Sequence, residues 1–477
     1  MINLVRNELK KIFHKKAIYV ILFIAIGFMI LNIVLTKYFE NNMVFERSQS
    51  DVEFYSGMLN ELDKNDPNYK ETYTNIKSQL ETAKLLQKYN SESWQWHVIT
   101  SNSEKYEQAK KEYDDFVEKL NKGDWRAFVQ AELNEVNEQI KAIETQDDSE
   151  SKISKEIQLI EPNIQKQVLE WRLEKDIPYG YSNKNQILSQ WEQSKKDLAN
   201  INEQEKNKKL TYQEKYDKQS AEEMYNLSEY YLKNNLKDNI NLTTFNERLN
   251  LASKSDSSLI TAFSGSSLFI IIVIVVIAGT IVSEEFNKGT IKLLLVRPYK
   301  RIKILTAKFI ACLIILVLTY LVIGVAQFIC EGISNGFGDY VGKAMIYNFN
   351  TNSVQEISTF KYMILSGIAI LPQYLLLMTL AFSLSVLFIN SPIAIALPLL
   401  GMMGSEIINQ IAYEFEKAKF LRFFVTPNWD LSQYLFGKLP EFEPISLPFS
   451  ITICVIYFVI MIIGSMIMFK KREIKNI

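Results

Sequence analysis

The sequence contains few of the residues that build disulfide scaffolds, metal sites or catalytic centres. Of its 477 residues, three are cysteine and two are histidine. His97 is the single histidine of residues 37–258, with no cysteine or second histidine near it, so we interpret it as an ordinary surface or core residue. The cysteines predict neither a disulfide framework nor a metal site, because all lie in or beside apolar runs: Cys312, Cys330 and Cys454.

Motifs for nucleotide hydrolysis and for hydrolytic catalysis are also missing. A phosphate-binding G-x-x-x-x-G-K-[ST] loop occurs nowhere, and Gly279 and Gly289 in GTIVSEEFNKGT lack both its spacing and its Lys-Ser/Thr pair. No serine nucleophile elbow or metalloprotease motif is present either. We therefore expect a chain that is not an enzyme, has no catalytic residue and no metal site, and binds no cofactor itself.

Glycine and proline are scarce in the polar stretch 37–258, which favours long helices. Apolar residues recur there at three- and four-residue intervals between Glu and Lys, and five tryptophans supply enough aromatic area for a core. The stretch carries 31 Lys and Arg against 41 Asp and Glu, whereas the rest of the chain carries 22 against 13. We predict an acidic, mostly helical domain and no nucleic-acid binding, because the basic residues lie at membrane edges and not on one soluble face.

Apolar sequence is abundant and is gathered into six runs long enough to cross a membrane. The first run, 17–36, has 20 residues without a charge, enough for roughly 30 Å of hydrocarbon. It follows residues 1–16, whose pattern predicts a basic amphipathic helix in the lipid headgroup layer. A cleaved signal peptide is the competing interpretation, but its apolar core would be shorter and no small-x-small site follows. The remaining predicted spans are 259–282, 304–330, 362–388, 392–412 and 447–469.

Three basic clusters determine the expected orientation. The N-terminus, residues 288–308 and residues 470–472 all fall on one side when six spans are threaded, and the positive-inside rule makes that side the cytoplasm. We therefore predict an all-α, multi-pass protein of the plasma membrane with both termini cytoplasmic. Its expected parts are an interfacial helix with the first span (1–36), an extracellular helical domain (37–258) and five further spans (259–477).

The polar stretch 283–308 lies between two spans and must therefore lie outside the bilayer. Two acids open it and a basic cluster closes it, an order that suits a short helix ended by Pro298, which we place within 283–303. Together with the basic first helix, its pattern E-F-x-x-G-T-x-x-L-L-L-x-x-P-x-x-R resembles the ABC-2 type permeases of ABC transporters. The resemblance covers 1–36 and 259–477, and its matching positions are Glu285, Phe286, Gly289, Thr290, Leu293, Leu294, Leu295, Pro298, Arg301 and Lys308.

The resemblance implies a cytoplasmic coupling helix that docks on a separate ABC ATPase subunit, which would use ATP and Mg. It also implies two permease halves, from a homodimer or from a heterodimer with a related permease, in contact with membrane lipid. The expected function is ATP-driven export of a peptide, a lipid-like compound or a hydrophobic drug, in a bacterial cell. The residues expected at the docking surface are Glu284, Glu285, Phe286, Gly289, Thr290, Leu294, Arg297, Pro298 and Arg301.

A different class of function stays open, because an extracellular helical domain between two spans is also the layout of a sensor. The ATPase would then drive movement of that domain without translocating a substrate. For a transport path, candidate residues are few: Pro372 and Gln373 interrupt the fourth span, and Glu406 is the acid nearest to a span interior. Glu406 is either functional or simply near the water-exposed end of the fifth span.

Overall fold

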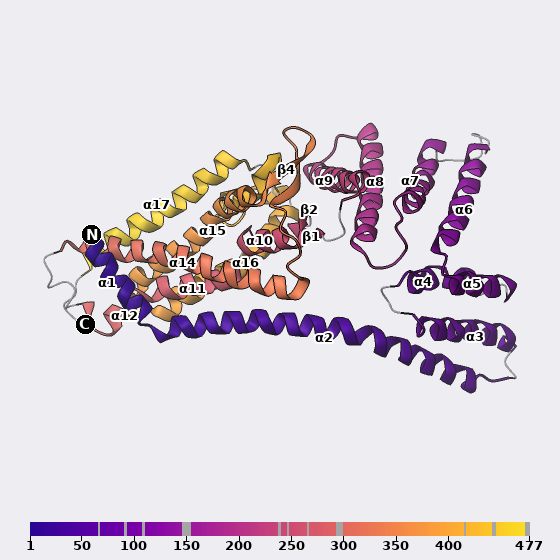
Figure 1. The fold of residues 1–477 in the computed structure, drawn as a ribbon. Coiled ribbons are helices and arrows are strands. Elements are labelled where there is room, and N and C mark those ends of the chain that lie inside the picture. Colours follow the sequence, from indigo (N-terminus) through magenta and orange to yellow (C-terminus); the bar gives the residue numbers. More distant parts are fainter. Residues whose placement is uncertain are drawn as a thin grey trace. The chain divides into compact units, whose positions relative to one another are not determined.

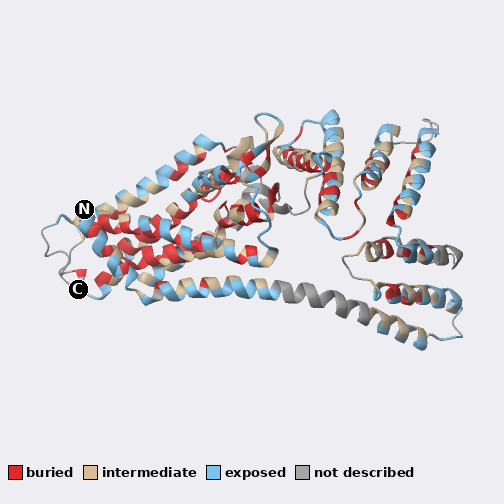
Figure 2. Cartoon of the chain, in the orientation of Figure 1, coloured by how far each residue is buried: buried red, intermediate tan, exposed pale blue. Residues whose placement is uncertain are grey.

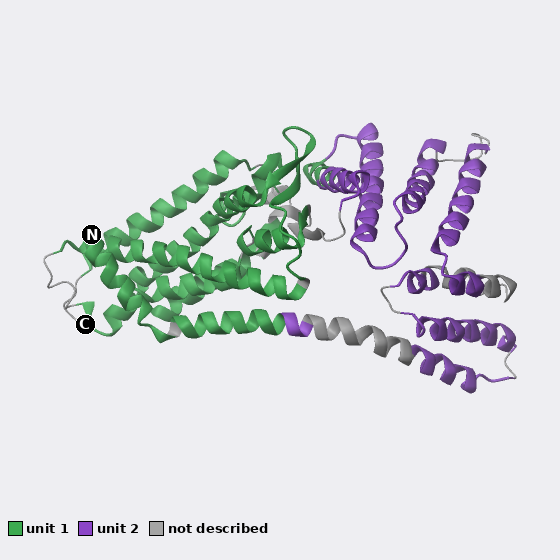
Figure 3. Cartoon of the chain, viewed as in Figure 1, with its two compact units in different colours: residues 1–32, 211–219, 243–477 green, residues 33–210, 220–242 purple. Residues whose placement is uncertain are grey.

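A computed structural model divides the chain into two compact units, each described here by itself (Figure 3). Unit 1 comprises residues 1–32, 211–219 and 243–477, and unit 2 comprises residues 33–210 and 220–242. The described elements are helices apart from four short strands, which confirms the predicted all-α membrane protein. The structure describes residues 1–64, 67–89, 93–106, 110–145, 154–236, 240–245, 248–264, 267–291, 299–414, 416–440 and 445–472.

Unit 2 consists of amphipathic helices that bury their apolar faces against one another. One cluster gathers Leu85, Val98 and Phe116, and another gathers Val129, Val136 and Leu169, among others. Two helices, α2 and α9, contribute residues to both units. The helices of this part of the chain are α2 (Lys16–Glu61), α3 (Tyr69–Leu86), α4 (Trp94–Tyr106), α5 (Lys110–Lys122), α6 (Trp125–Thr145), α7 (Lys155–Glu174), α8 (Asn183–Asn207) and α9 (Tyr212–Asn234).

Unit 1 is a bundle of apolar helices, with a sheet of four strands in the order β1-β2-β3-β4 (Figure 1). Strands β2 and β3 pair antiparallel, as do β3 and β4, with Leu251 opposite Met345 and Ala344 opposite Ile357. The strands are β1 (Ile240–Phe245), β2 (Arg248–Ser253), β3 (Lys343–Asn348) and β4 (Ser353–Ser358). The helices are α1 (Ile2–Phe13), α10 (Lys254–Ser264), α11 (Leu268–Thr280), α12 (Ser283–Asn287), α14 (Arg301–Asn335), α15 (Thr359–Phe388), α16 (Ser391–Glu414), η1 (Glu416–Phe423), η2 (Leu431–Gly437) and α17 (Leu447–Lys471).

Six segments of the described chain are long and apolar enough to span a membrane, one for each predicted span. The chain is therefore a membrane protein. The predicted second span, 259–282, is divided in the structure, because α10 ends at Ser264 and α11 begins at Leu268. The segments are Ile18–Leu35, Lys254–Asn287, Arg301–Ser334, Thr359–Phe388, Ser391–Asn409 and Leu447–Lys471.

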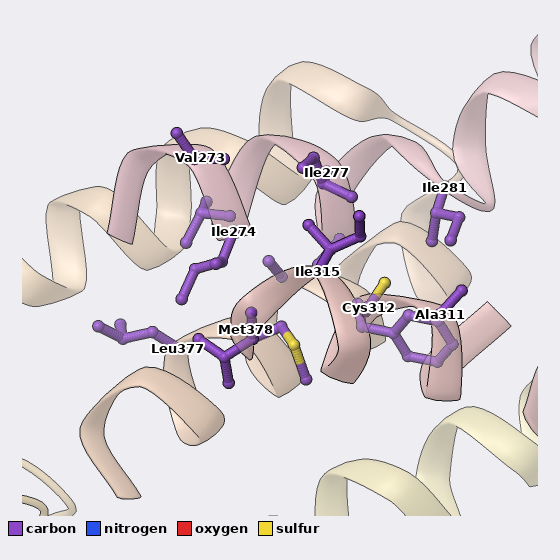
Figure 4. Packing of buried hydrophobic residues seen from close by; sticks show 14 of the residues in the cluster. Val273, Ile274, Ile277, Ile281, Ala311, Cys312, Ile315, Leu377 and Met378 are labelled. Atoms are coloured by element: carbon purple, nitrogen blue, oxygen red, sulfur yellow. The ribbon is translucent and has the colours of Figure 1, made fainter. Parts of the chain in front are cut away.

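Helix α11 lies at the centre of the bundle and is buried on nearly every side, as a helix that is apolar all round must be (Figure 2). Its isoleucine and valine side chains pack against Ala311 and Ile315 of α14 and against Leu377 and Met378 of α15 (Figure 4). Helix α16 approaches α11 closely at Gly279, where a Cβ atom would lie 3.0 Å from the Ile395 side chain and 3.1 Å from the Ala394 carbonyl oxygen. A larger residue at 279 would push these helices apart.

The stability of unit 2 should depend strongly on Trp191, which is fully buried, with its ring centre 4.6 Å from that of Trp171 and 6.0 Å from that of Tyr225. We expect Trp191→Ala to lower the free energy of unfolding by about 3–5 kcal/mol, because it removes this packing and leaves a cavity. Pulse proteolysis of the detergent-solubilised chain in urea measures the change. Tyr181→Ala is the matched control, since Tyr181 is 85% exposed and should matter by less than about 0.5 kcal/mol. Equal losses in the two variants would contradict the prediction.

Candidate functional site

One end of unit 1 brings together segments that are far apart in the sequence. The Arg301 guanidinium, at the start of α14, donates to the Arg472 carbonyl oxygen after α17 at 2.8 Å. Arg472 in turn donates to the Leu387 carbonyl oxygen of α15 at 3.0 Å, and its guanidinium carbon lies 5.8 Å from the centre of the Phe286 ring in α12. We call this the α12 end. In Figure 1 the N-terminus of the chain is drawn here.

Helix α12 is seated firmly in the bundle. Its first residue, Ser283, donates its backbone N–H to the Ser385 hydroxyl at 3.0 Å and shares a hydrogen bond of 2.7 Å with the Ser391 hydroxyl. Phe286 is buried and meets the Phe469 ring edge-on at 6.3 Å. These contacts join α12 to α15, to α17 and to the first residue of α16. Movement of α12 would therefore be shared by all three helices.

The segment predicted to hold the coupling helix, 283–303, is described only in part, because residues 292–298 lie outside the described residues. Helix α12 ends at Asn287, and residues 301–303 form the first turn of α14. Helix α12 ends where it does because of Gly289, which follows the C-cap residue Lys288. Gly289 has a φ of +67°, a left-handed conformation that ends helices and that glycine adopts at little cost. Gly289 makes a bend, and no atom of the described residues lies within 4 Å of the position its Cβ would take.

A network of four charged side chains fastens α12 to α1 and α14. Lys308 of α14 is completely buried, and its Nζ lies 2.7 Å from Glu8 Oε2 and 2.8 Å from Glu285 Oε2. Lys11 Nζ lies 2.9 Å from Glu8 Oε1 and 2.7 Å from Glu285 Oε1. Each carboxylate thus bridges both ammonium groups, so the charges balance. We call these four residues the ion-pair network.

The pKa shifts of the two α1 members, Glu8 and Lys11, favour their charged forms. Burial raises the pKa of Glu8, but Lys308 and Lys11 outweigh burial, so this pKa lies below its ordinary value. Burial lowers the pKa of Lys11, but Glu285 and Glu8 outweigh it, so this pKa lies above its ordinary value. The stabilisation by Glu8 is lost only as pH falls through its lowered pKa, and that by Lys11 only as pH rises through its raised pKa.

A cleft of about 700 Å³ opens beside the network, between α1 and the segment that contains α12. At its side, Lys15 Nζ lies 2.8 Å from Glu284 Oε2 and donates to the Thr280 hydroxyl at 3.1 Å. Lys288 reaches outward, with 70% of its side chain exposed. The cleft is lined by Leu4, Asn7, Glu8, Lys11, Ile12, His14, Lys15, Thr280, Ile281, Glu284, Glu285, Lys288 and Thr290. Its rim therefore offers both signs of charge to a partner.

The residues predicted to dock divide into two groups in the structure. Glu285 and Phe286 are buried and contact their own chain, whereas Glu284 and Thr290 line the cleft. Arg301 donates to carbonyl groups at the end of α17 and so closes the bundle. Leu294, Arg297 and Pro298 lie outside the described residues. Both acids of α12 are paired within the chain, but 32% of the Glu284 side chain is exposed against 11% of the Glu285 side chain, so Glu284 is the acid that a partner can reach.

The predicted pathway residues do not form one described cluster. Gln373 lies in α15, is buried, and its Oε1 has no hydrogen-bond partner. Pro372 precedes it inside the same helix, which continues through the proline. Glu406 belongs to α16, but its side chain is not among those the structure describes. Within the described part of the chain, no group of three or more His, Cys, Asp or Glu residues could hold a metal ion.

Sequence reasoning missed the contribution of Glu8, Lys11 and Lys15 to this site. Their partners lie more than 260 positions away in the chain, so spacing alone gives no sign of them. Two signals were nevertheless present. Glu8 is the single acid of residues 1–16, and Lys308 is the single charged residue of the apolar run 304–330. A charge inside an apolar span requires a partner, and an acid on a basic helix is one candidate.

Replacing the buried ammonium group tests the ion-pair network. Lys308→Met leaves Glu8 and Glu285 close together with only Lys11 between them, so we expect a loss of about 3–5 kcal/mol of stability. Thermal unfolding of the detergent-solubilised protein measures this loss. Lys303→Met, on the exposed side of the same helix, should change stability by less than about 0.5 kcal/mol.

A triple variant separates the network from a general packing effect. Lys308→Met combined with Glu8→Gln and Glu285→Gln removes the repelling carboxylates and should recover most of the stability. If Lys308→Met alone were as stable as the unaltered protein, the network would not hold these helices together.

Comparison with known proteins gives the family. A family described as "Protein of unknown function (DUF2705)" matches residues 228–475. "Uncharacterized protein YhcI" of Bacillus subtilis (strain 168) is 30% identical over 249 residues, which cover 51% of this chain and 78% of the relative. "Uncharacterized membrane protein YdbK" of the same organism is 30% identical over 205 residues, 42% of this chain and 76% of the relative. No solved structure matches. Because the family match spans more than half of its residues, this chain belongs to the DUF2705 family.

Proposed function

We propose that this protein is the membrane-spanning permease subunit of an ATP-driven ABC exporter, and that a separate ATPase subunit docks at the cleft between α1 and α12. The observation that carries the proposal is the ion-pair network. It makes α12, α1 and α14 one connected block at the end of the bundle where a charged cleft opens. The sequence pattern shared with ABC-2 permeases begins in this same block, at Glu285.

The block has the properties that a force-transmitting element needs. An ATPase that closes when it binds ATP produces a motion. This motion reaches the membrane spans only if rigid elements connect them to the ATPase. Separating the buried Lys308 ammonium group from its two carboxylate partners would leave uncompensated charge in an apolar bundle. The block should therefore move as a whole. Ser283 and Phe286 extend the connection to α15, to α17 and to the start of α16.

The structure supports different roles for the two acids of α12. Glu285 holds the block together, whereas Glu284 lies at the cleft, partly exposed, in surface ion pairs with Lys15 and Lys288 that a partner could replace. ATP and Mg would be bound by the partner, because this sequence has no phosphate-binding loop. In this arrangement docking and coupling depend on separate residues, which an experiment can distinguish.

The remaining parts of the proposal concern orientation and assembly. The three basic segments of the sequence include α1, the start of α14 and the end of α17, and described residues of all three lie at the α12 end. The positive-inside rule then places this end and both termini in the cytoplasm of a cell with a plasma membrane. A second permease, identical or related, would complete the path. The proposed cargo is a peptide, a lipid-like compound or a hydrophobic drug.

A second candidate function is a sensor whose extracellular domain is moved by the ATPase without transport. The observation that favours it is the extent of the family match, which begins at residue 228 and so leaves out residues 33–210 of unit 2. Those residues form helices with buried cores of their own. A folded domain added to a shared bundle points to an added task outside the membrane.

Paired substitutions in α12 test docking and coupling separately. In the complex purified with its native ATPase and reconstituted in vesicles, Glu284→Lys should reduce ATPase co-purification about tenfold, because it reverses a charge at the cleft. Glu285→Gln should leave co-purification unchanged but lower ATP-driven substrate accumulation about tenfold, because it loosens the block. Glu356→Gln, in an exposed ion pair of β4, should change neither.

Each result of this experiment bears on a different part of the proposal. Normal co-purification and normal accumulation in both α12 variants would remove the α12 end as the coupling site. ATP hydrolysis by the unaltered complex without accumulation of peptides, lipid-like compounds or drugs would favour the sensor. Recovery of the protein without any ATPase would argue against both functions.

A further inference from the structure

Helix α1 has two faces of different character. Leu4, Val5 and Ile12 on its inner face are buried in the apolar core of the bundle, and Glu8 on the same face reaches Lys308 of α14. The sequence predicts that the apolar side of this helix lies in the lipid headgroup layer. The structure packs most of that side against the protein, so contact with lipid must come from the outer face.

A strip of four exposed residues runs along the outer face of α1. Ile2, Arg6, Lys10 and Phe13 follow one another at intervals of four, four and three residues, which places them on the same side of a helix. Ile2 is 83% exposed and Phe13 is 46% exposed, and Arg6 and Lys10 are exposed between them. We call these four residues the outer strip. It combines two apolar side chains with two cations and contains no acid.

The outer strip lies on a positively charged surface. The single acid of residues 1–16 is Glu8, which is buried on the other face and already bridges two lysines of the ion-pair network. Lys16 after the strip and Lys303 on the neighbouring α14 are also exposed. A surface with this charge attracts negatively charged groups, and the attraction weakens as salt is added.

The first span, which follows the outer strip directly, favours lipid as the source of those groups. Phe13 ends α1, and α2 begins three residues later at Lys16. The spanning segment Ile18–Leu35 is only 11% buried, with Phe23 79% exposed, so its surface faces lipid. Figure 1 draws α1 and α2 as consecutive helices. The outer strip therefore lies where a lipid-facing span reaches the membrane surface.

A strip of this composition fits the boundary between acyl chains and headgroups. Apolar side chains enter the acyl region there, while the long side chains of arginine and lysine extend to phosphate groups. An acidic soluble protein would match the two cations of the outer strip. It would leave unexplained why Ile2 and Phe13 are exposed beside a lipid-facing span.

We propose that the outer strip of α1 binds anionic lipid headgroups, with Arg6 and Lys10 at the phosphate groups and Ile2 and Phe13 at the acyl boundary. Lipid then holds one face of α1, and the ion-pair network holds the other. Lipid binding requires neither an ATPase nor a particular orientation of the chain. Its failure would leave docking at the cleft untouched, and the failure of docking would leave lipid binding untouched.

Quenching of a tryptophan in the outer strip by brominated lipids tests the proposal. The full chain with Phe13→Trp is reconstituted in vesicles of phosphatidylcholine and phosphatidylglycerol in fixed proportion, with bromine on the acyl chains of one lipid or of the other. The six native tryptophans give a background, which the unaltered protein measures. The test variant adds Arg6→Gln and Lys10→Gln. The matched control adds Lys343→Gln and Lys361→Gln, which remove two exposed lysines of β3 and α15.

Both brominated lipids should quench the new tryptophan, because residue 13 lies at the acyl boundary. Phosphatidylglycerol should have an apparent affinity about fivefold higher than phosphatidylcholine at low salt, the factor that corresponds to ~1 kcal/mol from one cation near an anionic surface. This preference should disappear in the test variant and at high salt, and should persist in the control at low salt.

Three outcomes would overturn the proposal. Equal quenching by the two lipids in the Phe13→Trp protein would mean that the outer strip does not select charge. A preference that survives in the test variant would mean that Arg6 and Lys10 do not provide it. Absence of quenching by either lipid would mean that the outer strip faces water or an acidic protein.

Discussion

The structure of the bundle depends above all on one buried charge. Lys308 has no exposed surface, lies in an otherwise uncharged stretch of α14, and cannot keep its ammonium group ionised in such surroundings without counter-charges. Glu8 and Glu285 provide them, one from the beginning of the chain and one from the segment that follows the second span. The position of α1, the seating of α12 and the closeness of three helices at one end of the bundle all follow from this requirement. Lys11 then balances the second carboxylate charge.

The bundle contains polar groups of two kinds, and their difference is physical. At the α12 end the groups are charged, paired at 2.7–2.9 Å, and mutually dependent, so the helices they join form a rigid block. Between α10 and α11 the groups are neutral, and the Tyr320 and Tyr374 hydroxyls bond to the backbone at Phe263 and Ser267. Between these places α11 is packed by isoleucine, valine and leucine side chains, which hold helices without directional bonds. The bundle is thus held by directional charge pairs at one end and by close apolar packing along α11.

Much of this architecture could be predicted from the sequence, because hydropathy and helix periodicity are local. All six spans and the helical character of residues 37–258 follow from runs of residues that are contiguous in the chain. The ion-pair network could not be predicted, because Glu8 and Lys308 are separated by 300 positions and only packing brings them together. The interruption between α10 and α11 could not be predicted from hydropathy for another reason. Serine and glycine residues lower the mean hydropathy too little to divide an apolar run into two helices. The end of α12 depended on the backbone conformation of Gly289, which residue type alone permits but does not dictate.

The comparison with relatives bears on how the two units divide the work. The family match covers 228–475, so it includes Glu285 and Lys308 but not Glu8 or Lys11. One carboxylate partner of Lys308, Glu8, therefore precedes residue 228, where the family match begins, and the other, Glu285, follows it. A bundle that buries this lysine needs an acid from a preceding segment as well as the acid from α12. Residues 33–210 have no part in the network. The network thus belongs with the bundle, and unit 2 is free to differ without disturbing it. A large helical domain can therefore be inserted between the first two spans while the charged block keeps its geometry.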